Sequence, residues 1–276
     1  MDARPPYDTL RVTVAAGVAT VTIDHPPVNL MDAGMIGDLA RLVGELEADA
    51  GVRVVVIESA DREFFIAHAD VELIQRLPVP APPRSETLSP FHTMLERWRR
   101  LPKPTIAKIA GRARGGGSEF ALALDMRFGA RGRTLLAQPE VALGIIPGGA
   151  GTQNLPRAIG RARALEVILG AADVDAETAE RWGYLNRALP ESELDGFVDD
   201  LARRIASFPP GAVAAAKAAV DAGLTDPTLG LVEEADRFNQ AVADPEARRR
   251  MAAFLAVGGQ TREMERFLEN LAARLA

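Results

Sequence analysis

The chain has 276 residues, 47% of them hydrophobic and 25% charged, and its formal net charge is −6. This composition is typical of a globular protein with one large domain, or one domain with an appendage, and the lack of a basic stripe argues against a nucleic-acid partner. The absence of cysteine excludes disulfides and cysteine metal ligands. No apolar run is long enough to span a membrane and the first residues do not resemble a signal peptide, so we expect a cytoplasmic protein without a membrane partner.

The first sixty residues predict two strands, a helix and a third strand. Residues 10–23 alternate in two runs that Gly17 separates, which is typical of a β-hairpin. Apolar residues from 31 to 46 recur at helical spacing, and the apolar run 52–57 predicts a short buried strand. This order of elements indicates an α/β fold.

A loop and a helix follow. Residues 77–90 are rich in proline and predict a loop, and the spacing of apolar residues then predicts an amphipathic helix over 91–100. We expect its Trp98 to lie in the core and its arginines to form a solvated face.

Residues 105–125 predict a strand, a glycine turn and a helix. Three consecutive glycines, 115–117, lose much backbone entropy on folding, so they indicate either a conformation closed to other residues or a ligand close to the backbone. Good helix formers follow at 121–124. Because unpaired N–H groups and the helix dipole favour negative charge at a helix start, this turn could hold an oxyanion.

Two glutamates lie close to this turn in the sequence. Glu119 falls in the first turn of the predicted helix, and Glu140 follows a loop proline. Together they suggest paired acid/base chemistry on an acyl group. Each could equally be a solvated surface residue, which is the common interpretation of a glutamate in such a position.

Several motifs in the same order resemble those of the crotonase family, the enoyl-CoA hydratases and isomerases, over most of the chain. The family's G-x-A-x-G-G-G-x-E segment appears at 111–119 and its x-Q-P-E segment at 137–140. Residues 144–153 are similar to its G-x-x-P-G-x-G/A-G-T-Q segment, and residues 65–70 match its F-x-A-G-A-D segment with one change.

The resemblance implies a crotonase-like spiral of ββα units with a helical C-terminal region. Residues 1–200 would form the core that carries the acyl-CoA site, and residues 201–276 the trimerisation region. A homotrimer, or a hexamer built as a dimer of trimers, would be the assembly. Coenzyme A would be part of the substrate, so neither a separate cofactor nor a metal is expected.

The resemblance also assigns roles. The backbone N–H groups of Ala69 and Gly116 would form an oxyanion hole for the thioester carbonyl. Glu119 and Glu140 would flank one water, one deprotonating it for attack on the β-carbon and the other helping to deliver a proton to the α-carbon. This implies hydration of a 2-enoyl-CoA in fatty acid metabolism; the alternatives are isomerisation, other enolate chemistry, or non-catalytic acyl-CoA binding. The remaining predicted substrate-binding residues are Ala67, His68, Asp70 and Gly115.

The sequence departs from the family pattern at Asn154 and, nearer the predicted site, at three other positions. His68 stands where glycine is usual; it could be tolerated there because histidine accepts a positive φ more often than most residues, or it could line the acyl-CoA channel. Glu63 stands where many members carry a basic residue near the CoA phosphates, and Arg114 replaces an apolar residue. Arg262 and Arg266 are candidates for a basic residue beside CoA.

Ser118 invites another interpretation, because the residues around it resemble a hydrolase nucleophile elbow. The glycine expected two residues after the serine is missing, so we interpret Ser118 as a helix-start residue. The rest of the chain predicts a short strand at 184–189 and then helices at 191–206, 210–222, 230–243, 246–256 and 261–275, the last with an apolar stripe.

Overall fold

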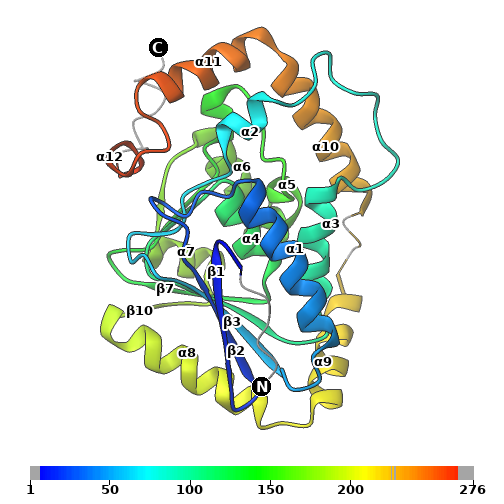
Figure 1. The fold of residues 1–276 in the computed structure, drawn as a ribbon, viewed down its shortest axis with the longest axis vertical. Helices are drawn as coiled ribbons and strands as arrows, with labels where there is room; N and C mark the ends of the chain where they lie inside the picture. The colour runs from blue at the N-terminus through cyan, green and yellow to red at the C-terminus, as the bar shows by residue number, and fades with distance from the viewer. Residues whose placement is uncertain (1–6, 225, 227, 267–276) are drawn as a thin grey trace.

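The computed structural model describes residues 7–224, 226 and 228–266 (Figure 1). Two sheets and the helices around them form the molecule. The larger sheet has six strands in the order β1-β2-β3-β5-β7-β10, and the smaller has four in the order β4-β6-β8-β9. The strands of the larger sheet are β1 (Leu10–Ala15), β2 (Val18–Ile23), β3 (Val54–Ser59), β5 (Thr105–Ile109), β7 (Met126–Ala130) and β10 (Arg187–Leu189). Those of the smaller are β4 (Phe64–Ile66), β6 (Arg112–Arg114), β8 (Leu135–Ala137) and β9 (Val174–Asp175).

The predicted hairpin is confirmed. β1 pairs antiparallel with β2, with Leu10 opposite Ile23, and the chain turns at Ala16 and Gly17. From β2 onward every neighbouring pair in the larger sheet is parallel. Parallel strands need crossover connections, and these connections carry the helices and the smaller sheet.

The parallel strands repeat as a spiral. β3 leads to β4, β5 leads to β6, and β7 leads to β8, so that each turn of the chain adds one strand to each sheet before a helical segment follows. β4, β6 and β8 pair parallel with one another. No strand was predicted at β4, because its three residues are all buried and show no alternation.

The helices agree with the predicted ones to within about two residues, except for the last, predicted over 261–275, of which the part from 267 onward lies outside the described residues. α1 starts after Asp32, whose side chain accepts a hydrogen bond from the Met35 amide. The predicted strand 184–189 is shorter than expected because the amides of Tyr184 and Leu185 bond to the Ala179 carbonyl of α7. The helices are α1 (Ala33–Ala48), α2 (Val71–Gln75), α3 (Pro90–Arg100), α4 (Gly116–Ala123), the 3-10 helix η1 (Glu140–Leu143), α5 (Gly151–Ile159), α6 (Arg161–Gly170), α7 (Ala176–Trp182), α8 (Glu191–Ala206), α9 (Pro210–Ala222), α10 (Thr228–Ala243), α11 (Pro245–Ala256) and α12 (Arg262–Glu265).

The main core lies between the two sheets and helices α1, α3 and α4. Trp98 is fully buried there, as predicted, and its ring meets that of Phe120 edge to face at 5.5 Å. On the other face of the larger sheet, α8 packs through Leu194, Val198 and Ala202. The sheet is therefore covered on both faces, as a parallel sheet requires.

The C-terminal helices cover the opposite end of the molecule from α8 and α9 (Figure 1). α10 and α11 pack over α2 and η1 through a separate apolar cluster that includes Leu143, Ile145, Met251 and Phe254. This cover closes the side of the molecule on which the candidate site lies. Within the described ranges, no helix is both long enough and apolar enough to cross a membrane.

Candidate active site

The glycine turn sits between a strand and a helix, as predicted. Gly115 ends the stretch after β6 with φ 47° and ψ −125°, a conformation that favours glycine, and α4 begins at Gly116. The Gly115 amide donates to the Ala137 carbonyl at 3.0 Å, which ties the turn to the neighbouring strand. This hydrogen bond fixes the orientation of the backbone N–H groups at the start of α4.

The structure brings Ala69 and Gly116 together from distant parts of the chain. The segment before α2 is held by hydrogen bonds between the Met31 amide and the His68 carbonyl and between the Asp70 amide and the Met31 carbonyl, at 2.9 and 3.0 Å. A Cβ atom on Gly116 would lie 3.2 Å from the Ala69 nitrogen. Among the described residues, neither the Ala69 nor the Gly116 amide donates to another protein group. Two adjacent amides are thus available to a ligand oxygen.

Glu119 is almost completely buried, so the solvated interpretation is wrong. Its side chain is on the first turn of α4, and Oε1 accepts hydrogen bonds from the Gly149 and Gly151 amides at 2.7 and 2.9 Å. Both donors lie at the start of α5. The predicted catalytic residue is therefore fixed by backbone rather than by another side chain.

Glu140 begins η1 and faces the same region. Its Oε2 atom is buried and accepts no hydrogen bond from the described residues. Oε1 lies close to the glycine turn, 2.7 Å from where a Cβ on Gly115 would be. A buried carboxyl oxygen without a partner is costly unless it is protonated or meets a ligand or water.

The two glutamates have raised proton affinities. Burial raises the pKa of Glu119 well above its ordinary value, and the charges of Glu140 and Glu234 raise it further, while the Gly149 and Gly151 amides oppose the shift by stabilising the ionised form. Burial likewise raises the pKa of Glu140, to about 8. Burial therefore favours the protonated form of both carboxyls, and the charge of Glu140 also acts on the pKa of Glu119.

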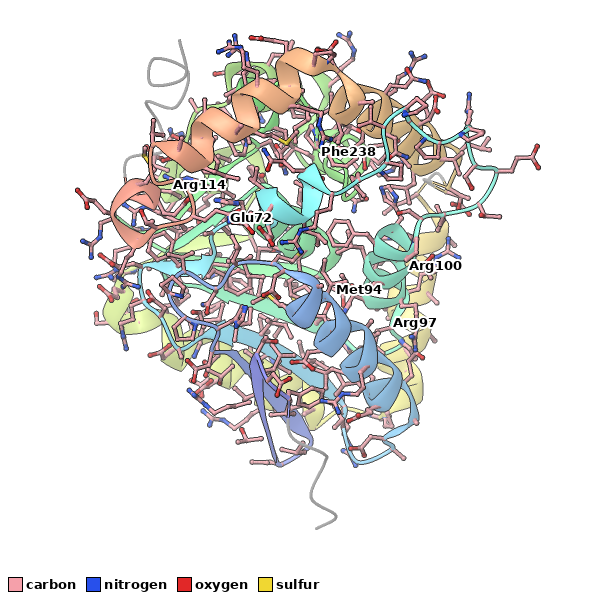
Figure 2. All side chains as sticks on the ribbon, turned by 45° about the horizontal axis from the view of Figure 1, so that its top comes forward. Glu72, Met94, Arg97, Arg100, Arg114 and Phe238 are labelled. Carbon is pink, nitrogen blue, oxygen red and sulfur yellow. The ribbon has the colours of Figure 1, made fainter. Side chains whose placement is uncertain are left out.

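Both glutamates line one cavity of about 490 Å³. Ala69, Asp70 and Gly116 also line it, whereas Ala67, His68 and Gly115 do not. Ala67 is instead buried in a small apolar cluster with Val28 and Phe64. The rest of the wall is mostly apolar and includes Phe238 of α10, labelled in Figure 2, together with Met31, Ile36, Leu73, Ile74, Leu77, Phe91 and Ile145. Such a lining suits an acyl chain better than a polar substrate.

Asp70 has a structural contact as well. Its side chain accepts a hydrogen bond from the Glu72 amide at 2.9 Å and so caps α2. The segment that carries the Ala69 amide is thereby joined to a helix start.

His68 does not have a positive φ, so the predicted reason for its tolerance is wrong. Its side chain is buried, with Nε2 2.9 Å from Glu265 Oε1 and Nδ1 2.8 Å from the Ala69 carbonyl oxygen. Burial alone would lower the pKa of His68, but the Glu265 carboxylate outweighs this and raises it. His68 lines a hollow of about 40 Å³ between Glu140 and Phe254 rather than the main cavity.

Arg114 forms part of the same buried contact. Its guanidinium pairs with Asp173 in a two-pronged contact at 2.7 and 2.6 Å, and its Nη1 donates to the Glu265 carbonyl at 2.6 Å. The two departures from the family pattern, His68 and Arg114, therefore meet the same residue of α12. Sequence reasoning missed Glu265 and Asp173, because nothing near either residue marks it as buried.

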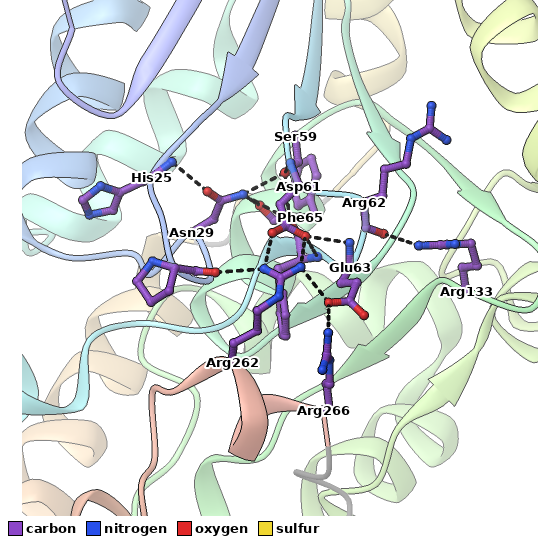
Figure 3. A network of polar contacts seen from close by, with 12 residues as sticks. His25, Asn29, Ser59, Asp61, Arg62, Glu63, Phe65, Arg133, Arg262 and Arg266 are labelled. Atoms are coloured by element: carbon purple, nitrogen blue, oxygen red, sulfur yellow. Dashed lines mark hydrogen bonds and ion pairs between the residues drawn. The ribbon is translucent and has the colours of Figure 1, made fainter.

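Arg262 and Arg266, the candidates for CoA contacts, are paired with acidic side chains of this chain. Figure 3 shows Arg262 between Asp61 and Glu63, and Arg266 beside Glu63 at 2.7 Å. These ion pairs lower the pKa of Glu63. The acidic residue that stands where a basic one is common thus has arginine partners from the C-terminal segment.

The arginines of α3 do not line the cavity. Arg97 pairs with Glu47 at 2.7 Å, and Arg99 and Arg100 both pair with Glu96. Arg97 and Arg100 lie at the outer side of the helix in Figure 2. The expected solvated face is confirmed for Arg97 and Arg100, whose side chains are 40% and 55% exposed, but not for Arg99, which is 21% exposed.

Ser118 lies inside the protein with no histidine beside it. Its hydroxyl contacts the Tyr184 hydroxyl and accepts from Gln138 Nε2 at 3.3 Å. The helix-start interpretation fits this contact, and a nucleophile would lack a base. No group of three or more possible metal ligands occurs within the part of the chain that the structure describes.

The spiral fold defines the chain as a crotonase-type α/β protein. More narrowly, it belongs to the enoyl-CoA hydratase/isomerase family, whose model matches residues 13–260. The chain is similar to the short-chain-enoyl-CoA hydratase of Clostridium acetobutylicum, at 32% identity over 240 residues that make up 86% of this chain and 91% of that protein. The predicted family is thereby confirmed.

Solved structures agree. A Streptomyces avermitilis protein provisionally named an enoyl-CoA hydratase has 43% identity and a TM-score of 0.89, covering 98% of this chain and 99% of that one. An enoyl-CoA hydratase from Mycobacterium avium subsp. paratuberculosis has 27% identity and a TM-score of 0.78, covering 91% and 97%. The predicted fold class is confirmed by these neighbours.

Proposed function

We propose that the protein hydrates a 2-enoyl-CoA thioester to a 3-hydroxyacyl-CoA. The observation that carries the proposal is that one apolar cavity is lined by the buried Glu119, by Glu140, whose Oε2 atom is buried, and by the residues of the two available amides. Family membership supports an acyl-CoA substrate, and the paired carboxylates favour hydration over isomerisation, for which one positioned base is enough. Coenzyme A belongs to the substrate, and the chemistry needs no separate cofactor.

The roles follow from the surroundings of each group. Glu119 accepts two amide hydrogen bonds, which stabilise its ionised form, whereas Glu140 has a buried oxygen without a donor, which suits its protonated form. Glu119 takes a proton from water as the water oxygen bonds to the β-carbon. The electron pair of the double bond moves to the thioester oxygen, held by the Ala69 and Gly116 amides. The α-carbon then takes a proton from Glu140, and transfer of a proton from Glu119 to Glu140 restores the pair.

The test is the loss of enoyl absorbance on a panel of short and long 2-enoyl-CoA thioesters. The expected product has gained one water and carries a 3-hydroxyl group, and the rates across the panel give the chain-length preference. Conversion of 3-enoyl-CoA to 2-enoyl-CoA without hydration would instead support an isomerase. Acyl-CoA binding with neither reaction would support a binding protein.

A methyl group on Gly116 is expected to disturb the two amides. A Cβ there lies 3.0 Å from the Ala69 Cβ and 3.2 Å from the Ala69 nitrogen, so the Ala69 segment must shift. Because the amides stabilise charge that develops only in the transition state, Gly116→Ala should lower kcat for hydration about 10²–10³-fold with a smaller change in KM. Gly196→Ala on α8, where a Cβ meets nothing within 4 Å, is the matched control. Equal kcat in the two variants would contradict the proposed oxyanion hole.

Self-association is the second part of the proposal, with a trimer or a dimer of trimers as the assembly. α9 has no buried residue, and apolar side chains are exposed on and beside it, Phe208, Val220 and Leu224 among them. They border a hollow of about 590 Å³ between α9 and the sheet. A second copy of the chain would cover this apolar face.

A further inference from the structure

Two carboxylates share the short turn 149–152 at the start of α5. Glu119 takes the amides of Gly149 and Gly151. Glu234, from α10, accepts hydrogen bonds from the other two amides of the turn. The Ala150 amide donates to its Oε1 at 2.5 Å and the Thr152 amide to its Oε2 at 2.7 Å. Successive amides of the turn thus donate alternately to Glu119 and to Glu234. A shift of the turn that follows one carboxylate therefore also displaces the donors of the other.

Glu234 is as buried as Glu119, at 2% exposed, and it does not line the cavity. Besides the two amides it accepts the Thr152 hydroxyl, and Nε2 of His92 lies 2.9 Å from its Oε1. The other ring nitrogen of His92 lies 2.8 Å from Ser89 Oγ, at the cap of α3. Glu234 therefore joins α10, the turn and the start of α3 at one point.

α10 is also closely packed on this turn. A Cβ on Gly148 would lie 2.6 Å from the Phe238 ring, and one on Gly230 would overlap the side chain of Gln153. A side chain larger than hydrogen at Gly148 in the loop or at Gly230 in α10 would therefore push the helix away from the turn. The position of Glu234 relative to the turn is set by this packing rather than by the carboxylate alone.

We propose that Glu234 is a positioning residue for the hydration step, which orients the amides that hold Glu119 and, through its negative charge, strengthens Glu119 as a base. This inference rests on the proposed hydratase function. It adds a buried carboxylate that does not line the cavity to the two glutamates that do. The motifs that indicated Glu119 and Glu140 contain no sign of it.

Besides burial, the negative charge of Glu234 raises the pKa of Glu119. Burial is the largest cause of the raised pKa of Glu119, and the charges of Glu140 and Glu234 add to it. The positive end of α5 and the turn amides act in the opposite direction. Removing the charge of Glu234 while keeping its size should therefore lower the pKa of Glu119 and make it a weaker base.

The kinetic test compares Glu234→Gln with Glu233→Gln. Glu233 is the neighbour on the same helix. Its side chain is 40% exposed and pairs with Arg84 and Arg237, and its variant is the matched control. For Glu234→Gln we expect kcat to fall about 10²-fold, the cost of a misplaced reacting group, with KM nearly unchanged. We also expect the acidic limb of the pH profile of kcat/KM, which reports ionisation of Glu119, to move to lower pH. An unchanged pH limb and an unchanged kcat would overturn the proposal.

A second measurement does not depend on any activity. The carboxyl carbon of Glu119 is followed by NMR in ¹³C-glutamate-labelled protein without substrate, and it is assigned by its loss in Glu119→Gln. Its pKa should be lower in Glu234→Gln than in wild type and unchanged in Glu233→Gln. If wild type shows no hydration but this pKa falls, the hydratase proposal fails while the coupling stands. If the pKa is unchanged in folded Glu234→Gln, the coupling itself is wrong.

If Glu234→Gln does not fold, Glu234→Asp supplies the test. Its charge remains, but the side chain is one methylene shorter and its oxygens withdraw from the Ala150 and Thr152 amides. We expect the pKa of Glu119 to stay raised while kcat falls. Full kcat in Glu234→Asp would overturn the positioning role.

Discussion

Replacing either Glu119 or Glu140 with glutamine is expected to lower kcat for hydration by about 10²–10⁴-fold, the usual contribution of one positioned acid or base. Glutamine has nearly the same shape, and at Glu119 its oxygen can still accept the Gly149 and Gly151 amides, so the fold should survive. It cannot take a proton from water or give one to carbon. KM should therefore change much less than kcat.

The effects of the two changes should not add. If the glutamates act on one water in one step, the double variant should be little worse than the slower single variant. Glu72→Gln is the matched control, because Glu72 is exposed on the neighbouring helix α2 and pairs only with Arg76 among the described residues (Figure 2). Hydration at the wild-type rate in Glu119→Gln or in Glu140→Gln would exclude the residue concerned from the mechanism.

The pH dependence of hydration tests whether Glu140 acts as the proton donor. Burial raises the pKa of Glu140 to about 8, so this carboxyl is protonated at lower pH. If it delivers the proton to the α-carbon, kcat/KM of the wild type should fall as the pH rises past about 8. Activity that instead continues to rise through this range would indicate that Glu140 works in its ionised form.

The sequence predicted those parts of the site that lie within one continuous segment. The strand, the glycine turn and the helix that carry Gly116 and Glu119 are adjacent in the chain, and their residue types are locally consistent. The hairpin and the helices from α8 to α11 have clear periodicity for the same reason. β4 and the short strands of the smaller sheet were not predicted, because three buried residues in a row have no period to detect.

The contacts that complete the site connect residues far apart in the sequence. Glu265 approaches His68 across 197 positions, and Glu234 approaches His92 across 142. Each of these glutamates lies on a helix that carries other, less buried acidic residues, so composition and spacing give no reason to single it out. Only the packing of α10 and α12 over the site distinguishes them.

Breaking the buried contact between His68 and Glu265 is expected to be the most costly of these changes for stability. Glu265→Gln removes the charge that faces His68 in a site where both side chains are almost fully buried, at 8% and 0% exposed. Losing one member of a buried ion pair typically costs about 3–5 kcal/mol. Glu263→Gln, an exposed position on the same helix, is the matched control. The free energy of unfolding from denaturant titration measures both.

The pH dependence of this loss separates an ion pair from simple packing. The pKa of His68 is raised from its ordinary value of 6.5, so its contribution to stability is complete below that value and is lost as the pH rises through the folded pKa. The pKa of Glu265 is lowered from 4.5 because the charge and hydrogen bond of His68 outweigh its burial, so its contribution is complete above 4.5 and is lost as the pH falls through the folded pKa.

The two conditions overlap between about pH 4.5 and 6.5, where the difference between wild type and Glu265→Gln should be largest. Above that range the difference in stability should shrink as His68 loses its proton. The nearby charge of Arg114 lowers the pKa of His68 and so favours this loss. A loss of stability that is the same from pH 5 to pH 9 would show that Glu265 stabilises the C-terminal segment through hydrogen bonds and packing alone. A loss of stability that is largest between about pH 4.5 and 6.5 would show that the charges of His68 and Arg114 attract Glu265 and so hold α12 against the site.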